Sequence, residues 1–286
     1  MHACPGPDRH TKRPAFRMPA GACDCHAHIF GPQALYPFSE QRSYTPEDCT
    51  VDDYRKLLDI LGVERAVIVH GGANGTDNRV TLDALRSLGS RSRAIVVMPP
   101  GLPLEERREM HRLGVRGYRM STVVGGGVGF DRLEELAAEA AQLGWHLVLH
   151  FRRATEMTEL APRLRALQVD YVLDHIGRIR GEEGVDSPGF RTLAELLDGG
   201  RAWAKLASLY RLSSQPYPHA DMLPMIHEVV RRWPERIIWG SNWPHPICDV
   251  AMPNDGDLVD LIPLWIPDAQ VQHKMLVDNP ARLYGF

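Results

Sequence analysis

Two histidines in alternate positions, His26 and His28, lie at the end of a short apolar stretch that begins at Ala22. Alternate residues of a strand share one face, so both imidazoles are expected to point the same way, with Asp24 below them. Imidazole binds metal ions and transfers protons near neutral pH. The pattern predicts a pocket with histidine chemistry, although two separately hydrogen-bonded histidines would give the same short motif.

Other polar side chains stand at the ends of later apolar runs. Arg119 ends one run, and Asn242 directly follows another. In an α/β barrel the C-terminal ends of the strands form the rim of the active site. We therefore expect five histidines to converge on one rim: His26, His28, His70, His150 and His175. Taken singly, His70 or His150 could instead be structural.

Short β-rich runs alternate with longer amphipathic runs from Ala22 onward, which is typical of a parallel sheet with helical crossovers. Eight strands are predicted, at residues 22–28, 65–70, 93–98, 115–119, 145–151, 170–175, 202–206 and 236–241. Helices are predicted at residues 52–61, 77–88, 104–113, 131–143, 154–167, 190–197, 220–233 and 257–264, with a last one at 268–277. Eight strand–helix pairs predict an α/β fold, a single-domain (β/α)8 TIM barrel over residues 19–286. A doubly wound sheet would carry a glycine fingerprint after its first strand, and this chain has none.

Composition limits the kind of partner. The chain has 286 residues, a formal charge of -3 and no block of like charges, so nucleic acid and anionic membranes are not expected partners. It has no apolar run of about 20 residues and no secretory signal, which predicts a cytoplasmic protein with a small-molecule partner. Residues 1–18 are predicted to form a flexible N-terminal arm. The five cysteines are odd in number, and Cys23 and Cys25 are splayed too rigidly within one strand to bridge each other.

Nearly the whole chain from Pro19 onward resembles the amidohydrolase superfamily, in the branch of 2-pyrone-4,6-dicarboxylate lactonase. The resemblance rests on five segments: Pro19–Pro32, Gly75–Asn78, Asp174–Arg178, Trp239–His245 and Asn279–Pro280. It implies a distorted (β/α)8 barrel and chemistry at a lactone carbonyl. It also implies that the divalent metal used by most of the superfamily is not required.

The resemblance implies roles for two sets of residues. Three histidines polarise or orient the lactone carbonyl: His26, His28 and His175. One hydroxyl and two guanidinium groups hold the substrate carboxylates: Tyr44, Arg119 and Arg211. A guanidinium suits this role because its planar fork matches a carboxylate and stays charged. His70 and His150 complete the expected substrate-binding set, His150 standing where the lactonase has a tyrosine.

The chain departs from this pattern in the loop Val123–Gly129, which lacks the second carboxylate-binding arginine of the lactonase. The glycine-rich loop also lacks the Lys-Ser/Thr pair of a phosphate loop. Arg116 and Arg178 are expected to form ordinary surface salt bridges.

The largest departure is Asn242, where the lactonase and its metal-dependent relatives have an aspartate. An amide cannot take a proton from water and is a poor zinc ligand, so we expect no cofactor, with zinc left as an alternative. An asparagine here is similar to D-galactarolactone isomerase, as are the segments Ser208–Asp221 and Leu264–Asp268. Isomerisation needs no activated water, because a hydroxyl of the substrate attacks its own lactone carbonyl.

These observations predict an enzyme that performs acyl transfer on a small carboxylated lactone. Isomerisation is favoured and hydrolysis is the alternative; a zinc-dependent hydrolase or decarboxylase and an inactive acid-binding barrel also stay open. In the favoured scheme three groups stabilise the oxyanion, His26, His28 and Asn242, and His175 transfers the proton. The oligomeric state is not predicted.

Overall fold

The computed structural model describes residues 2–286, and eight parallel strands form its central sheet. The order of the strands around the sheet is β10-β9-β8-β7-β6-β5-β4-β2, so consecutive strands are neighbours, as in a (β/α)8 barrel. The strands are β2 (Cys23–Ala27), β4 (Arg65–Val69), β5 (Ser92–Val96), β6 (Val115–Ser121), β7 (His146–His150), β8 (Tyr171–Leu173), β9 (Ala202–Leu206) and β10 (Ile237–Trp239). The predicted fold class and all eight predicted strands are confirmed.

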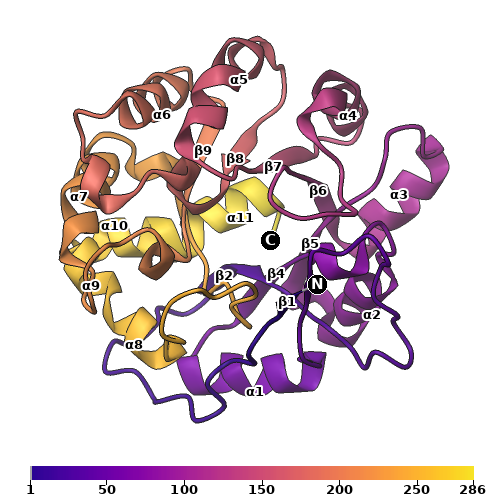
Figure 1. Cartoon of the computed structure of the whole chain (residues 1–286), viewed down its shortest axis with the longest axis horizontal. Helices are drawn as coiled ribbons and strands as arrows, with labels where there is room; N and C mark the ends of the chain where they lie inside the picture. The colour runs from indigo at the N-terminus through magenta and orange to yellow at the C-terminus, as the bar shows by residue number, and fades with distance from the viewer. Residues whose placement is uncertain (1) are drawn as a thin grey trace.

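Helices surround the strands, and α11 lies across the middle of the view in Figure 1. The helices between the strands are α1 (Val51–Leu61), α2 (Arg79–Leu88), α3 (Leu104–Leu113), α4 (Leu133–Ala141), α5 (Ala154–Ala166), α6 (Pro188–Asp198) and α7 (Leu223–Arg232). The last predicted crossover helix is divided into α8 (Asp255–Asp260) and α9 (Ile262–Trp265), and α10 (Ala269–His273), a π-helical turn and α11 (Asn279–Tyr284) follow. A capping box at Thr50 and a left-handed Gly62 delimit α1, as is common at helix ends.

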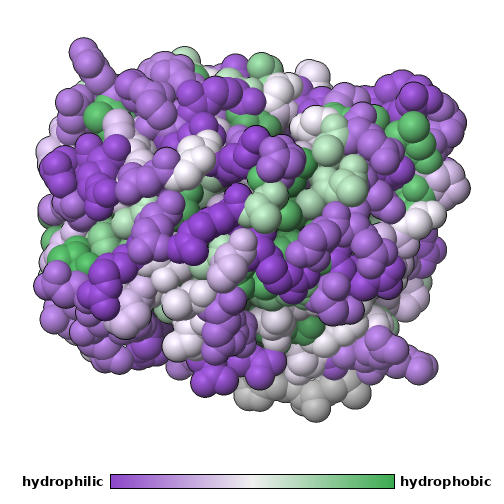
Figure 2. Space-filling view, turned by 90° about the horizontal axis from the view of Figure 1, so that it is seen from above, coloured by the Kyte–Doolittle hydropathy of each residue, from purple (hydrophilic) through white to green (hydrophobic). Residues whose placement is uncertain are grey.

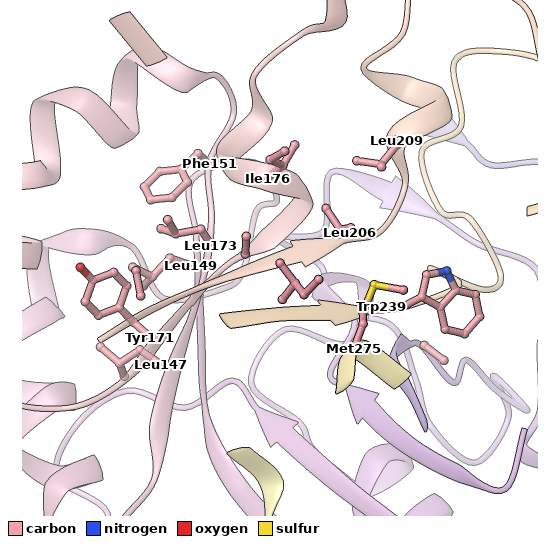
Figure 3. Close-up of a cluster of buried hydrophobic side chains, with 14 of the residues drawn as sticks. Leu147, Leu149, Phe151, Tyr171, Leu173, Ile176, Leu206, Leu209, Trp239 and Met275 are labelled. Atoms are coloured by element: carbon pink, nitrogen blue, oxygen red, sulfur yellow. The ribbon is translucent and has the colours of Figure 1, made fainter. Parts of the chain in front are cut away.

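The alternation of side chains along each strand decides which residues face the barrel interior. In β7 and just after it, Leu147, Leu149 and Phe151 pack in the layer between strands and helices (Figure 3). Val148, at an alternate position, belongs to a separate apolar cluster inside the barrel, which also contains Val172 and Trp203. His150 lies two positions after Val148 and therefore on the same face of the strand, so its imidazole points into the barrel mouth.

The barrel closes between β2 and the chain that follows β10. Asn242 donates its backbone N–H to the oxygen of His26 over 2.8 Å, and His28 donates to the oxygen of Trp243 over 2.7 Å. Gly240 permits this approach, since a Cβ at that position would lie 2.6 Å from the Cβ of His26. The seam therefore joins the two motifs that the sequence singles out.

A register shift in β2 lies between Asp24 and Ala27, and the contact of Asp24 with the histidines is to the backbone N–H of His26, 3.0 Å from Oδ1. The Asp24 carboxylate accepts hydrogen bonds from Tyr54 Oη (2.9 Å) and from Ser241 N and Oγ (2.9 and 2.5 Å). Cys23 and Cys25 point into the barrel interior. The expectation that Asp24 lies below the imidazoles is therefore wrong, because the irregular register breaks the simple alternation of the strand.

The N-terminal residues contact the barrel, although the sequence suggested a flexible arm. The first strand, β1 (His2–Ala3), pairs with β3 (Tyr44–Thr45). Lys12 donates its backbone N–H to Asn254 over 3.0 Å, and Phe16 donates to Asp260 over 2.8 Å. Met1, which belongs to the predicted arm, lies outside the described residues.

The surface seen in Figure 2 is mainly hydrophilic, with scattered hydrophobic residues. Within residues 2–286, the helices are all too short or too polar to cross a membrane. The five cysteines are free thiols, in agreement with the sequence prediction.

Candidate active site

Four of the five predicted histidines meet at the barrel mouth: His26, His28, His150 and His175. The ring centroid of His26 lies 4.9 Å from that of His28 and 5.0 Å from that of His175. His150 lies 5.2 Å from His175. All four side chains are buried, so they form an enclosed cluster.

The fifth histidine, His70, does not join this cluster. Its Nδ1 lies 2.8 Å from Thr81 Oγ1 on α2, and its Nε2 lies 3.1 Å from the Gly75 oxygen. His70 follows Val69, whose side chain faces the barrel interior, so the alternation of the strand turns His70 toward the helices. Both of its nitrogens have protein partners, and its contribution to the site is its backbone oxygen, which lies 3.3 Å from Arg119 Nη1.

A chain of hydrogen bonds fixes the tautomers of His28 and His26. His28 Nδ1 lies 2.7 Å from the Val69 oxygen, so Nδ1 carries the proton and Nε2 must accept. His26 Nε2, 3.2 Å away, therefore donates to His28 Nε2. The remaining nitrogen of His26, Nδ1, accepts from Lys205 Nζ at 3.1 Å. Neither imidazole has a free proton for an oxyanion in this arrangement.

Lys205 and Asp174 form a fully buried ion pair beneath the histidines. Lys205 Nζ lies 2.8 Å from Asp174 Oδ1, and Arg119 Nη2 lies 3.6 Å from Asp174 Oδ2. Burial alone would raise the pKa of Asp174, but the Lys205 ammonium holds this pKa well below its usual value. The site therefore contains one ionised carboxylate between two cations.

His150 presents a hydrogen-bond donor to the site. Arg119 Nη2 lies 3.2 Å and Ser121 Oγ lies 3.1 Å from its Nδ1, and a guanidinium can only donate, so Nδ1 accepts. Burial first, and then the charge of Arg119, lowers the pKa of His150 well below its usual value, so the ring is neutral. The proton must then lie on Nε2, which is buried and has no hydrogen-bond partner among residues 2–286.

His175 presents a hydrogen-bond acceptor to the site, a free lone pair, where His150 presents a donor. Its Nδ1 lies 2.9 Å from the Ala207 oxygen, so the proton is on Nδ1 and Nε2 is unprotonated. Burial lowers the pKa of His175 to about 3. His175, Ile176 and Arg178 all have positive φ angles, a backbone conformation that is costly for residues other than glycine and that recurs at functional sites.

Asn242 is held by side chains that the sequence analysis did not single out. Its Nδ2 donates to Tyr210 Oη over 3.1 Å and lies 3.4 Å from Ser208 Oγ. Tyr210 Oη in turn lies 2.8 Å from His245 Nδ1. The expectation that Asn242 offers an N–H to the oxyanion is therefore corrected, since both amide hydrogens already face protein oxygens.

Three arginines give the site a positive character: Arg119, Arg178 and Arg211. Each has a buried Nε without a hydrogen-bond partner in the described chain. Arg211 lies 3.5 Å from the mostly exposed Asp249. Arg178 has no ion pair within residues 2–286, which corrects the expectation of a surface salt bridge, and its charge contributes to the lowered pKa values of His150 and His175. Arg116, also expected in a salt bridge, instead donates to the backbone oxygens of Tyr284 and His111.

Tyr44 lies close enough to Arg119 to feel its charge. The Ala73 backbone N–H donates to its hydroxyl oxygen over 3.3 Å, which leaves the hydroxyl proton free to donate to an anion. Burial raises the pKa of Tyr44 to about 12, so the hydroxyl stays protonated. Beside the site, Tyr210 lines a cavity of about 410 Å³ between the loops that follow β9 and β10.

A divalent metal fits these residues poorly. His26, Asp174 and His175 bring possible ligand atoms within 4.8 Å of one another. However, Lys205 and Arg119 already pair with the carboxylate, and a dication would add to their two buried positive charges. His150 turns a protonated nitrogen toward the site, and the amide of Asn242 supplies no charge.

We therefore predict that the purified protein contains much less than one zinc ion per chain. Plasma emission spectrometry after gel filtration measures this content, and dialysis against a chelator should leave the thermal midpoint of unfolding unchanged. A stoichiometric metal, or a large loss of stability on chelation, would contradict this interpretation of the charges.

No role is predicted from the sequence for four residues of the site: Asp174, Lys205, Tyr210 and His245. The alternation of side chains along a strand could have indicated two of them. Asp174 and Lys205 each lie two positions after a residue that faces the barrel interior, Val172 and Trp203, so they share its face. A lysine within a short apolar strand is itself unusual, because buried lysines require a partner. Tyr210 and His245 lie in two segments that carry the family resemblance, but they meet only through the folding of two loops, so neither segment indicates their contact.

Comparison with known proteins gives several full-length matches. The sequence profile of the family described as amidohydrolase matches residues 23–286. A 4-sulfomuconolactone hydrolase of Hydrogenophaga intermedia is 40% identical over 290 residues, covering 99% of this chain and 94% of the relative. A 2-pyrone-4,6-dicarboxylate hydrolase of Comamonas testosteroni is 38% identical over 284 residues, covering 95% and 92%.

A D-galactarolactone isomerase of Agrobacterium fabrum is 30% identical over 275 residues, covering 95% of this chain and 92% of the relative. A crystal structure of an Agrobacterium tumefaciens protein superposes with a TM-score of 0.86 at 30% identity, covering 96% of this chain and 98% of that chain. The relatives thus include lactone hydrolases and a lactone isomerase.

Proposed function

This chain belongs to the amidohydrolase family, as an enzyme of its lactone hydrolase and isomerase type, and we propose that it hydrolyses a small anionic lactone with His175 as the general base. The observation that carries the proposal is the free, unprotonated Nε2 of His175, next to the unpaired N–H of His150. These two groups supply the base and the oxyanion donor that acyl transfer requires.

In the proposed reaction His175 Nε2 takes a proton from water as the water oxygen attacks the lactone carbonyl carbon. The carbonyl oxygen becomes an oxyanion and accepts the hydrogen bond of His150 Nε2. When the tetrahedral intermediate collapses, the bond between the carbonyl carbon and the ring oxygen breaks, and the ring oxygen receives the proton held by His175. No metal takes part in these steps.

The charges of the site support an anionic substrate. Lys205 and Arg119 together face the single carboxylate of Asp174, while the exposed Asp249 is the one acidic group near Arg178 and Arg211 among residues 2–286. Counting these six groups gives four positive and two negative charges. We propose that Arg178, Arg211 and Tyr44 bind the carboxylate or sulfonate groups of the lactone.

Isomerisation is the second candidate, and Asn242 favours it. An amide oxygen can orient a hydroxyl but cannot deprotonate it, which suits a nucleophile that the substrate itself positions. In that case His175 would remove the proton from a substrate hydroxyl in place of water. The two reactions use the same base and the same oxyanion donor, and they differ in the nucleophile.

The test is a substrate screen followed by replacement of the base. The purified enzyme is incubated with 2-pyrone-4,6-dicarboxylate, 4-sulfomuconolactone and D-galactarolactone, and NMR distinguishes an opened acid from a new ring. His175→Gln is expected to lower kcat by about a hundred- to ten-thousand-fold, because it removes the base. His227→Gln, at an exposed position on α7, serves as the matched control and should keep full activity.

Full activity of His175→Gln would overturn the proposed base. An opened acid as product supports hydrolysis, and a ring of different size would establish isomerisation instead.

A further inference from the structure

We propose that Asp255, His245 and Tyr210 form a positioning relay that turns the amide oxygen of Asn242 toward the nucleophile. This inference rests on the proposed function and deepens it. None of the three relay residues is assigned to substrate contact. They act through Asn242, whose side-chain orientation they determine by a sequence of hydrogen bonds.

The relay begins at a buried carboxylate. Asp255, the first residue of α8, places Oδ1 3.2 Å from His245 Nε2, and the exposed fractions of the two side chains are 1% and 0%. An ionised carboxylate can only accept a hydrogen bond, so His245 carries a proton on Nε2. A ring that carries its one proton on Nε2 has Nδ1 as an acceptor.

The next two hydrogen bonds determine which side-chain group of Asn242 is the donor. Tyr210 donates its hydroxyl proton to His245 Nδ1 over 2.8 Å, so the Tyr210 oxygen is left as an acceptor. The side-chain group of Asn242 that lies 3.1 Å from this oxygen must therefore be the NH2 group. The other amide hydrogen faces Ser208 Oγ at 3.4 Å.

The Asn242 backbone is fixed as well. Its N–H donates to the His26 oxygen over 2.8 Å, its oxygen accepts from the His245 N–H over 2.7 Å, and its φ angle is +66°. With the backbone held and both amide hydrogens used, Oδ1 is the one side-chain polar atom of Asn242 without a partner within residues 2–286. An amide oxygen accepts the O–H of a water or a substrate hydroxyl and aligns its lone pair for attack.

The relay also explains why an aspartate is not equivalent at this position. A carboxylate cannot donate to Tyr210, so the Tyr210 proton would turn toward residue 242 and leave His245 Nδ1 without a donor. Asn242→Asp is therefore expected to lower kcat, although it adds a potential base.

Histidine tautomers give a test that does not depend on the substrate. Nitrogen-15 NMR of histidine-labelled protein, with His245 assigned by its loss in His245→Gln, should show a proton on Nε2 and none on Nδ1. Tyr210→Phe should shift the Nδ1 resonance toward that of a free acceptor. A proton on Nδ1 of His245, in a neutral or a doubly protonated ring, would overturn the relay, because every later direction depends on Nδ1 being an acceptor.

A kinetic cycle separates positioning from general stability. With the lactone turned over in the screen above, Tyr210→Phe is expected to lower kcat about 10- to 100-fold with little change in KM, because the nucleophile loses its alignment. In an Asn242→Ala background the same replacement should have no further effect. Tyr118→Phe also removes one hydroxyl of a buried tyrosine, bonded to Glu139, and should leave kcat unchanged.

Equal effects of Tyr210→Phe in both backgrounds would overturn the relay, since Tyr210 would then act independently of Asn242. The proposed base can fail while the relay holds, and the two results are distinguishable. In that case the His175→Gln enzyme is active, but His245 still carries its proton on Nε2 and the effect of Tyr210→Phe still depends on Asn242. If none of the three lactones is converted, the tautomer measurement decides alone.

Discussion

Acidification from about pH 7.5 to about pH 5 is expected to unfold this protein. Six buried histidines have pKa values below the usual one, with burial as the largest cause in each case: His26, His28, His70, His146, His150 and His175. The pKa is about 4 for His70 and about 3 for His146 and His175. Below about pH 6.5 the unfolded chain binds protons that the folded protein excludes.

The sign of the effect follows from this difference. The stabilisation is complete above about pH 6.5 and is lost as the pH falls toward the folded pKa values of about 4 and about 3. Each histidine lowers the free energy of unfolding by about 1.4 kcal/mol per pH unit, so six would remove about 8 kcal/mol per unit. A typical domain has about 5–15 kcal/mol in total. The lowered pKa of Asp174 acts in the same direction at lower pH, and the raised pKa of Asp24 opposes it.

Urea denaturation followed by circular dichroism between pH 8 and pH 5.5 measures this dependence. His146→Leu is a suitable comparison, because His146 lies beside Tyr284 and its buried Nε2 has no hydrogen-bond partner in the described chain. This variant should bind about one proton fewer on unfolding and should resist acid better than the wild type. An unfolding free energy that stays constant between pH 7.5 and pH 5.5 would contradict the prediction.

Lys205→Met is expected to cost both stability and activity. It removes the ammonium that lies 2.8 Å from Asp174 and 3.1 Å from His26 Nδ1. Loss of one partner of a buried ion pair typically costs about 3–5 kcal/mol. His26 would also lose the donor that fixes its tautomer, so its Nε2 would no longer be compelled to donate to His28. We expect a fall in the unfolding free energy of this size and a loss of kcat of at least about tenfold.

The double variant Lys205→Met/Asp174→Asn separates the two effects. Replacing the carboxylate that has lost its lysine should restore part of the stability, and the remaining deficit reflects Arg119, which then lacks its carboxylate partner. It should not restore kcat, since His26 still lacks its donor. A stable and fully active Lys205→Met protein would show that the ion pair does not organise the site.

The sequence predicted the barrel well because its signals are local. The apolar runs around Val67 and Val148 are short and regularly spaced, and glycines such as Gly62 follow the helices between strands, so period and capping identify the elements. The same reasoning placed His26, His28, His150 and His175 at strand ends, where the structure brings them together.

The errors arise where local alternation fails or where two loops meet. The register shift in β2 turns Asp24 away from the histidines, and the position of His70 after Val69 turns its ring toward α2. Arg178 lies in a left-handed turn that no sequence pattern indicated, and it faces the site where a surface ion pair was expected.

The sequence by itself thus determined the fold, the rim and most of the side chains that occupy it, because strand period and strand order depend on neighbours in the chain. Only the tertiary structure decided what each side chain can do. The proton positions of His26 and His175, and the direction of the Asn242 amide, depend on partners far away in sequence: Lys205, Ala207 and Tyr210. A histidine or an amide is donor or acceptor only in relation to the atom that it faces, and folding alone supplies that atom.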